Sequence, residues 1–346
     1  MTLLCAGLLT AQTNQGGKDK QDDPDGKVWG YAFGDYFYKA GGDSTVSALD
    51  YTGYKKDFNS LEFRRIYLGY DHNISRDFMA RFVLAYDGSD LLASGKRSVI
   101  VKDAFLAWKE IFSGSALTIG LQPTPSFSFL SEKVWGYRSV EKTIMDLRGI
   151  TGSRDMGVML NGSFDKESKF GYYLMIATGS ALRMEINKYK KYYGMLSGSF
   201  AEKKITADIY GDYESSGPDR NRGTLSSFLS WSGENITAGA EGFIQKNNTS
   251  STAGFDPFGI SVFITGNITK DRFRFFTRYD FFNPDTRTAQ YGYNQHFVTA
   301  GIDYMPVPKV HIMPNLWLNA YAKKHADSYG RKSDVVPRIT FYYDYR

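Results

Sequence analysis

Cysteine and histidine are nearly absent from this chain, which has one cysteine and four histidines in 346 residues. The cysteine, Cys5, lies in an apolar N-terminal segment, so no disulfide framework can form within the chain. Beyond that segment no apolar run approaches the roughly 20 residues of a membrane-spanning helix. A mean hydropathy of −0.38 is also too polar for a helical membrane protein. A net charge of +5, without a long basic stretch, is too mild to indicate nucleic-acid binding.

Aromatic residues and glycine are abundant instead. The chain has 25 tyrosines, 25 phenylalanines and 35 glycines, and aromatic residues make up 16% of it. Chains that stay disordered are poor in aromatic residues, so disorder of the whole chain is excluded. What remains is an all-β protein that is rich in tyrosine, phenylalanine and glycine.

The first 27 residues differ in character from the rest. Residues 1–11 combine an apolar core with small residues, as a signal peptide does, and we expect cleavage after Ala11. Residues 12–27 are polar and charged without apolar periodicity, which predicts a flexible linker. Residues 28–346 show no shift in composition, so we expect them to form one domain.

Side chains alternate with a period of two along this whole domain. Between residues 168 and 180, for example, Phe170, Leu174 and Ile176 share one face. Successive side chains of a strand point to opposite faces, so the pattern indicates strands and not helices. The predicted strands lie at residues 28–39, 60–71, 76–88, 98–109, 115–122, 154–165, 168–180, 189–201, 202–214, 222–232, 234–246, 258–269, 271–283, 295–305, 309–323 and 335–346.

Strand length decides between a soluble sandwich and a transmembrane barrel. The segments exceed the ~5–6 residues of a sandwich strand and match the ~9–11 residues of a tilted membrane strand. We therefore expect an antiparallel up-and-down transmembrane β-barrel of about 16 strands with an aqueous channel. Aromatic residues near strand ends are expected to form its interface girdles; they include Trp29, Tyr31, Tyr67, Tyr70, Trp108, Tyr192, Tyr193, Trp231, Trp317 and Tyr343.

A long insertion, residues 123–153, interrupts the series of strands after the fifth one. Long connections in compact β proteins are usually functional or mobile. In a barrel of this size the insertion can fold inward and narrow the pore. It can also lie over the barrel mouth as an extracellular loop.

The chain resembles the phosphate-selective porins O and P, a family of outer-membrane porins. The matching motifs are Phe63-Arg64-Arg65, Lys102-Asp103-Ala104-Phe105, Gly120-Leu121-Gln122-Pro123, Glu141-Lys142, Arg154-Asp155-Met156-Gly157-Val158 and Arg278-Tyr279-Asp280. They cover the first half of the chain well and the second half thinly. The resemblance implies a trimeric, sixteen-stranded porin of the bacterial outer membrane with an inward-folded loop. Its expected partners are membrane lipid, lipopolysaccharide and small hydrophilic or anionic solutes.

Two sets of basic residues are candidates for the pore. The first set lies on predicted strands, opposite apolar faces, and comprises Arg65, Arg81, Arg272, Arg274 and Arg278. An arginine that faces lipid at mid-depth costs about 2–4 kcal/mol, so these side chains should point into the lumen and attract anions. The second set lies between Pro123 and Asp155, in the insertion and directly after it, and comprises Lys133, Arg138, Lys142, Arg148 and Arg154. Four acidic residues nearly balance it, which predicts a weak anion preference and not phosphate specificity; they are Glu132, Glu141, Asp146 and Asp155.

Other classes of function remain as alternatives. An enzyme would need a nucleophile and a base held by a third polar group. His72 falls in an apparent turn, and His296 and His311 have no evident Ser or Asp partner. No nucleotide loop or metal cluster is recognisable, so no cofactor is expected. A barrel that acts as an adhesin or binds a ligand without an open channel is the main alternative.

Overall fold

The computed structural model describes residues 25–45, 49–88, 91–217, 220–249, 255–287, 292–326 and 329–345. The expected signal peptide and most of the expected linker lie outside these residues. The first strand begins at Asp25, ahead of the expected start at Val28. Residues 25–27 are strand because they pair with Asp71, His72 and Asn73 of the next strand.

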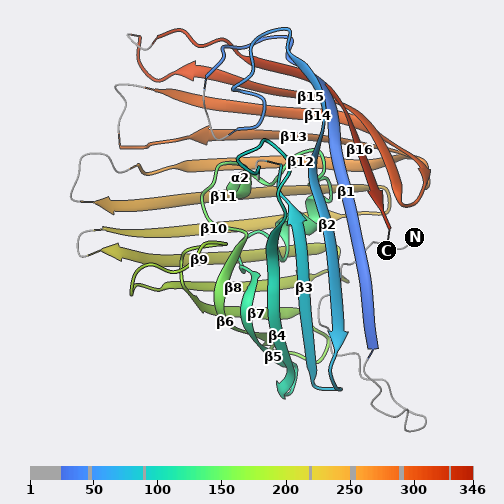
Figure 1. Cartoon of the computed structure of the whole chain (residues 1–346), viewed down its shortest axis with the longest axis vertical. Helices are drawn as coiled ribbons and strands as arrows, with labels where there is room; N and C mark the ends of the chain where they lie inside the picture. Colours follow the sequence, from blue (N-terminus) through green and yellow to red (C-terminus); the bar gives the residue numbers. More distant parts are fainter. Residues whose placement is uncertain are drawn as a thin grey trace.

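Sixteen antiparallel strands form one closed barrel (Figure 1). Each strand pairs with its neighbours in sequence, and the first pairs with the last. The strands are β1 (Asp25–Tyr38), β2 (Asn59–Asn73), β3 (Phe78–Tyr86), β4 (Ile100–Phe112), β5 (Ser115–Pro123), β6 (Arg154–Ser163), β7 (Phe170–Ala177), β8 (Lys191–Phe200), β9 (Ile205–Gly217), β10 (Arg220–Ser232), β11 (Ile236–Thr249), β12 (Phe258–Thr269), β13 (Phe273–Asn283), β14 (Tyr293–Val307), β15 (Val310–Lys323) and β16 (Asp334–Asp344). The expected number and order of strands are confirmed.

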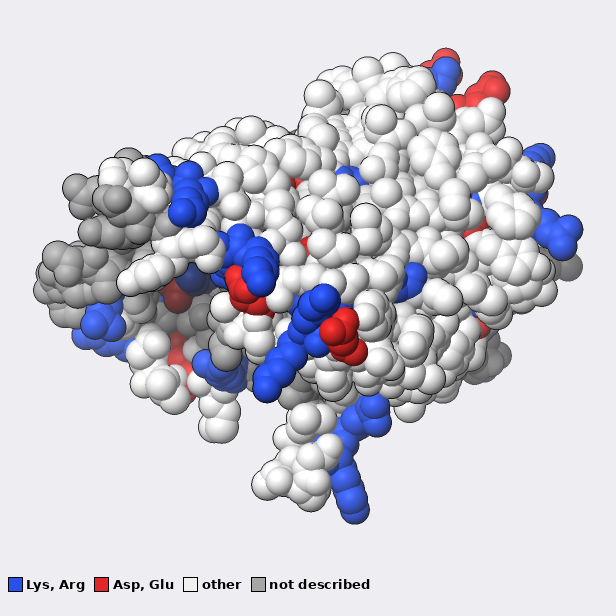
Figure 2. All heavy atoms as spheres, turned by 90° about the horizontal axis from the view of Figure 1, so that it is seen from above, with Lys and Arg blue, Asp and Glu red and all other residues white. Residues whose placement is uncertain are grey.

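The outer face of the barrel is apolar. On β7 the outward side chains of Phe170, Leu174 and Ile176 are exposed, whereas Tyr173 and Met175 face inward and are buried. Figure 2 shows that Lys, Arg, Asp and Glu lie toward the left and right ends and along the lower edge of this face, while the wall between the ends carries few of them. A closed barrel leaves no strand edge unpaired, and an apolar outer wall suits lipid. The fold fits a transmembrane β-barrel.

Only part of the expected aromatic girdle faces outward. Trp108, Tyr192 and Trp231 are 43%, 50% and 49% exposed on the outer face. Tyr193 and Trp317 point inward and are buried. Adjacent residues of a strand face opposite sides, so Tyr192 and Tyr193 cannot both contact lipid. Other members of the expected girdle also face the lumen, namely Trp29, Tyr31 and Tyr67.

The insertion lies inside the barrel, as Figure 1 and its contacts with the inner wall show. It contains two short helices, α1 (Ser131–Trp135) and α2 (Ile144–Leu147), which contact β11 and β12. Within the described residues, no helix is long and apolar enough to cross a membrane.

Apolar side chains pack on both sides of the insertion. Ile144 and Met145 join a buried cluster with Met159, Met175 and Met195 of the wall. A second cluster surrounds Trp135 and is completed by Tyr137, Val140, Phe228, Phe263, Phe276 and Met313. The lumen therefore contains a packed core around the insertion and is not an empty channel.

Strand β5 approaches β4 closely at Gly120, shortly before the insertion. This glycine has φ +132°, and a Cβ there would lie 2.3 Å from the Ala104 carbonyl oxygen and 2.8 Å from Phe105 Cα. Since backbone on β4 cannot move aside cheaply, Gly120→Val should disrupt β4–β5 pairing. The folded band that migrates differently before and after heating should be lost in electrophoresis.

Gly53→Ala is the matched control, because nothing lies within 4 Å of a Cβ at Gly53. This variant should keep the heat-sensitive migration of the wild type. Identical migration of the wild type before and after boiling would contradict the closed barrel. Normal folding of Gly120→Val would contradict the close approach at this glycine.

Candidate functional site

The candidate site is the place where the insertion meets the inner wall of the barrel. It begins with a β-bulge between β1 and β2, where the register shifts between Phe33 and Gly34. Phe33 pairs with Arg65 and Gly34 pairs with Phe63, so Arg64 is the extra residue on β2. A bulge interrupts the alternation of faces. Arg64 and Arg65 therefore both reach the lumen, although they are adjacent in sequence.

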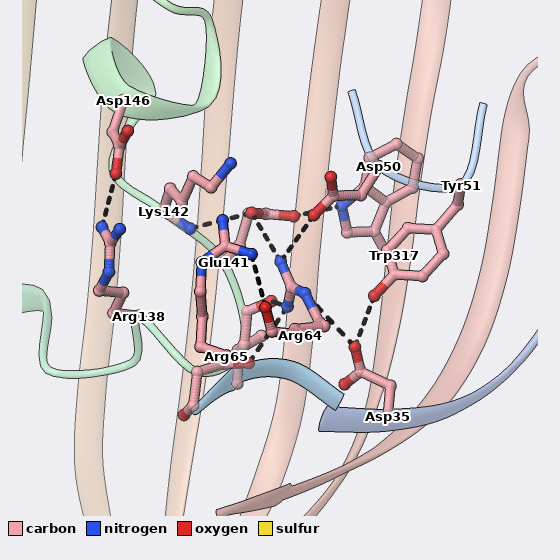
Figure 3. Close-up of polar contacts among 12 residues, drawn as sticks. Asp35, Asp50, Tyr51, Arg64, Arg65, Arg138, Glu141, Lys142, Asp146 and Trp317 are labelled. Atoms are coloured by element: carbon pink, nitrogen blue, oxygen red, sulfur yellow. Dashed lines mark hydrogen bonds and ion pairs between the residues drawn. The ribbon is translucent and has the colours of Figure 1, made fainter. Parts of the chain in front are cut away.

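The Arg64 side chain links the insertion to the loop between β1 and β2 (Figure 3). Its guanidinium donates to the carbonyl oxygens of Val140 at 2.8 Å and Ser139 at 3.2 Å. It also donates to the carboxylates of Asp50 at 3.0 Å and Glu141 at 3.2 Å. One buried side chain thus joins three separate parts of the chain.

Glu141 is fully buried and accepts from a second donor, which lies on β15. The Trp317 indole Nε1 donates to its Oε2 at 2.7 Å, as Figure 3 shows. Burial raises the pKa of Glu141, but the charges of Arg64, Arg338 and Lys142 outweigh this effect and lower its pKa overall. Glu141 is therefore an ionised anchor that the Arg64 guanidinium and the Trp317 indole hold in place.

A second guanidinium, that of Arg338 on β16, reaches the same turn of the insertion. It donates to the Val140 carbonyl oxygen at 3.0 Å and to the Tyr51 hydroxyl at 2.9 Å. The Tyr51 hydroxyl donates to Asp35 on β1 at 2.5 Å. The Val140 carbonyl thus accepts from both arginines, which fixes this turn between β2 and β16.

Asp50 completes the cluster from the connection between β1 and β2. Burial opposes its ionisation, yet the charges of Arg64, Lys142 and Arg65 lower its pKa to about 2. Asp50 is therefore a carboxylate at any pH near neutral and holds its connection against Arg64.

Other contacts hold the insertion to the remaining wall. The Tyr137 hydroxyl donates to Asp303 on β14 at 3.2 Å. Arg278 on β13 donates to the Lys142 carbonyl oxygen and forms an ion pair with Asp280. Further bonds link the insertion to β11: Ser131 to Glu241 at 3.2 Å, and Gln245 to the Ile150 carbonyl oxygen at 2.9 Å. The insertion is thus attached at widely separated points of the barrel.

Between the insertion and the wall of β2–β4 lies a set of half-buried charges. On the wall, Arg65 and Lys102 both pair with Asp87 at 2.9 Å. On the insertion, Arg138 pairs with Asp146 at 2.5 Å and also with Glu132 (Figure 3). Partial burial raises the pKa of Asp87, but Lys102, Arg65 and Arg138 together lower it. The charges on the insertion and those on the barrel wall are therefore close enough to interact.

The strand arginines occupy different positions. Arg81 faces inward but is paired with Asp71 through bonds of 2.6 and 2.8 Å. Arg278 is buried, as described above. Arg274 is half-buried, lies 5.7 Å from the Tyr137 ring centroid and has no ion pair with any described residue. Arg272 lies exposed in the turn before β13 and not on the lumenal wall, because the strand begins two residues later than expected.

The basic residues of the insertion also lie in different environments. Lys133 is exposed on α1, 5.5 Å from the Phe129 ring centroid. Arg154 opens β6 and pairs with Asp103 on β4. Figure 3 shows the Lys142 side chain extending away from the Arg64 cluster. Arg148 donates to the amide oxygens of Gln295 at 2.7 Å and Asn319 at 3.1 Å.

Sequence reasoning missed several residues of the site. Arg64 was named only within a family motif; regular alternation from Arg65 would turn it to the outer face, and the bulge brings it inward. Arg338 and Trp317 gave no sign that they meet the insertion, since their partners lie far away in sequence. His311 has an acidic partner after all, because its Nδ1 lies 3.0 Å from both carboxylate oxygens of Asp303.

Comparisons with known proteins concern the fold. No family model matches the chain, and no curated protein matches it. The outer membrane channel DcaP of Acinetobacter baumannii is 13% identical, with 95% of this chain and 99% of that chain covered and a TM-score of 0.69. The anion-selective porin of Comamonas acidovorans is 11% identical over 93% and 100%, with a TM-score of 0.65. A trimer form of OmpT, an outer membrane protein of Vibrio cholerae, is 10% identical over 94% and 100%, with a TM-score of 0.61. The chain therefore has the fold of outer-membrane porins.

Arg64→Gln should free the insertion from β2. Breaking a buried ion pair typically costs about 3–5 kcal/mol, because the remaining charge loses its partner. We expect a lower thermal unfolding temperature in detergent and faster proteolysis near Ser139. Arg65→Gln is the matched control, since its partner Asp87 keeps Lys102. Equal effects of the two substitutions would contradict the anchoring role of Arg64.

Proposed function

We propose that this chain is a porin of the bacterial outer membrane through which small hydrophilic solutes diffuse passively. The observation that carries this proposal is the insertion, which is attached to the inner wall at widely separated points of a closed barrel. An attached insertion reduces the cross-section that is open to solutes and leaves the barrel wall intact. The apolar outer wall and the porin fold support the membrane location.

The proposed solute path runs between the insertion and the wall of β2–β4. Arg65 and Asp87 are 12% and 20% exposed there, and Arg138 and Asp146 on the facing insertion are 18% and 15% exposed. Paired charges inside a barrel keep this exposure only where water reaches them. On the other side of the insertion, Ile144 and Met145 pack against apolar wall residues and fill that part of the lumen.

A weak anion preference is part of the proposal. Most basic residues along the path are paired with carboxylates, as Arg65 is with Asp87 and Arg154 with Asp103. Paired charges nearly cancel at a distance, so they give little selectivity. Arg274 on β13 forms no ion pair with a described residue, although Asp303 lies opposite it on β14, and it adds positive charge to the lumen away from this path. This balance favours a general porin related to the phosphate-selective family but without phosphate specificity.

The proposed assembly is a homotrimer surrounded by lipid and lipopolysaccharide. The resemblance to the porins O and P implies a trimer, and one similar structure is a trimer form. The apolar outer wall offers surface for both neighbouring subunits and lipid.

A binding barrel without an open channel is the second candidate. Four buried apolar clusters favour it, because they fill much of the space that a wide channel would need. Trp135 and Trp317, both almost fully buried, are the largest side chains in this filling. Conductance separates the two candidates.

Deleting residues 126–145 should raise the single-channel conductance in planar bilayers. The deletion removes both the helix α1 and the turn that Arg64 holds, so the lumen should widen. A deletion of residues 182–187, an exposed stretch between β7 and β8, is the control and should change little. An unchanged conductance after the first deletion would show that the insertion does not narrow the pore. A wild type without any conductance would favour the binding barrel.

Arg274→Gln should shift the reversal potential in a potassium chloride gradient toward cation preference. The substitution removes a lumenal charge that forms no ion pair with a described carboxylate. Arg272→Gln changes the same charge in an exposed turn and should leave the potential unchanged. A clear cation preference of the wild type, or equal potentials for all three proteins, would refute the proposed selectivity.

A further inference from the structure

An open cavity of about 590 Å³ lies apart from the Arg64 cluster, at the ends of β9, β10 and β11. Residues 148–150 of the insertion form one of its sides, and the strand ends form another. The cavity is within the common size range of small-molecule sites, which are about 300–1,000 Å³. Its lining combines basic, amide and apolar side chains.

Arg148 is the central basic group of this cavity. Its guanidinium is held by the neutral amides of Gln295 and Asn319 and lies 4.8 Å from the Phe282 ring centroid. Its Nε is buried and has no hydrogen-bond partner. Burial lowers the pKa of Arg148 to about 10, although the negative charge of Asp280 acts to raise it. A buried cation without a bonded carboxylate is costly unless an anion compensates it.

Two further arginines strengthen the positive character of the cavity. Arg222 pairs at 2.6 Å with Glu214, and Glu214 is the one acidic residue of the lining. Arg220 is exposed at the start of β10 and forms no ion pair with any described residue. Three guanidinium groups therefore face one carboxylate, and the excess positive charge favours an anion.

The apolar part of the lining limits the kind of anion. Phe282 and Ile150 lie beside Arg148, and Pro257 and Phe255 continue this surface toward the outside. Phe255 is 61% exposed although it is a large apolar side chain. A fully hydrated ion such as inorganic phosphate would leave this surface without a partner. A solute with an apolar body and one carboxylate would use both parts of the cavity.

We propose that the cavity beside Arg148 binds small organic carboxylates with an apolar body. Their carboxylate accepts from Arg220 and from the terminal NH2 groups of Arg148, each of which keeps one N–H besides its bond to Gln295 or Asn319, and their apolar body packs on Phe282 and Phe255. A guanidinium suits this role because its donors match the geometry of a carboxylate. The proposal deepens the proposed porin function, on which it rests, by placing a solute site at the mouth of the barrel.

Calorimetric titration of the purified barrel in detergent with benzoate tests this proposal without requiring conduction. Benzoate should bind, and Arg148→Gln should weaken binding by about tenfold, because a charged hydrogen bond is lost. Phe255→Ala and Arg220→Gln should each weaken it by a smaller factor. Arg76→Gln, in the exposed turn between β2 and β3, is the charge-matched control and should bind benzoate as the wild type does.

Three outcomes would overturn the proposal. The first is unchanged benzoate affinity in Arg148→Gln, or in both Arg220→Gln and Phe255→Ala if Arg148→Gln fails to fold. The second is equal binding of benzyl alcohol, which would remove the role of the carboxylate. The third is binding of inorganic phosphate as tight as that of benzoate. Benzoate binding by a barrel that does not conduct would instead refute the porin function and leave the cavity assignment in place.

Discussion

The rest of the lumen depends on one irregularity of the wall, the bulge opposite Phe33 and Gly34. Regular alternation would place the guanidinium of Arg64 against lipid, where a charge is costly. The bulge turns it inward, and there it donates to the Val140 carbonyl oxygen and to Glu141. Without Arg64, Glu141 would lose its ion pair, and the Val140 carbonyl would keep only the guanidinium of Arg338. The bulge thus solves two problems together, since it keeps the charge from lipid and holds the insertion in the barrel.

The contacts of Arg64 with the insertion explain why the two sides of the lumen differ in polarity. Because the turn around Val140 is held between Arg64 and Arg338, the helix α2 that follows presses Ile144 and Met145 against the opposite wall. That side becomes a packed apolar core. The side of β2–β4 retains paired, half-exposed charges instead, which suit water and small solutes. A sixteen-stranded barrel is wide, and here the protein's own insertion determines how much of that width remains open.

Alternation of side chains was enough to predict the sixteen strands, their order and the inward direction of Arg65, since these depend on local pattern alone. The partners inside the lumen could not be predicted, because they come from distant parts of the chain. Trp317 meets Glu141 across 176 residues, and nothing near Trp317 in sequence signals this contact. The inward direction of Arg64 could not be predicted for a different reason. A bulge adds one residue to one strand, and a period-two pattern read from that strand alone does not reveal it.

Thiol labelling at Val140 tests most directly whether the insertion is held inside the barrel. Val140 is fully buried between the two arginines, so Val140→Cys in a Cys5→Ser background should resist a water-soluble thiol reagent until the barrel is unfolded by heat. Gly53→Cys, in the exposed part of the connection between β1 and β2, should react at once in the same background. Equal and rapid labelling of both positions in the folded barrel would contradict the account, because it would place the turn of the insertion in water.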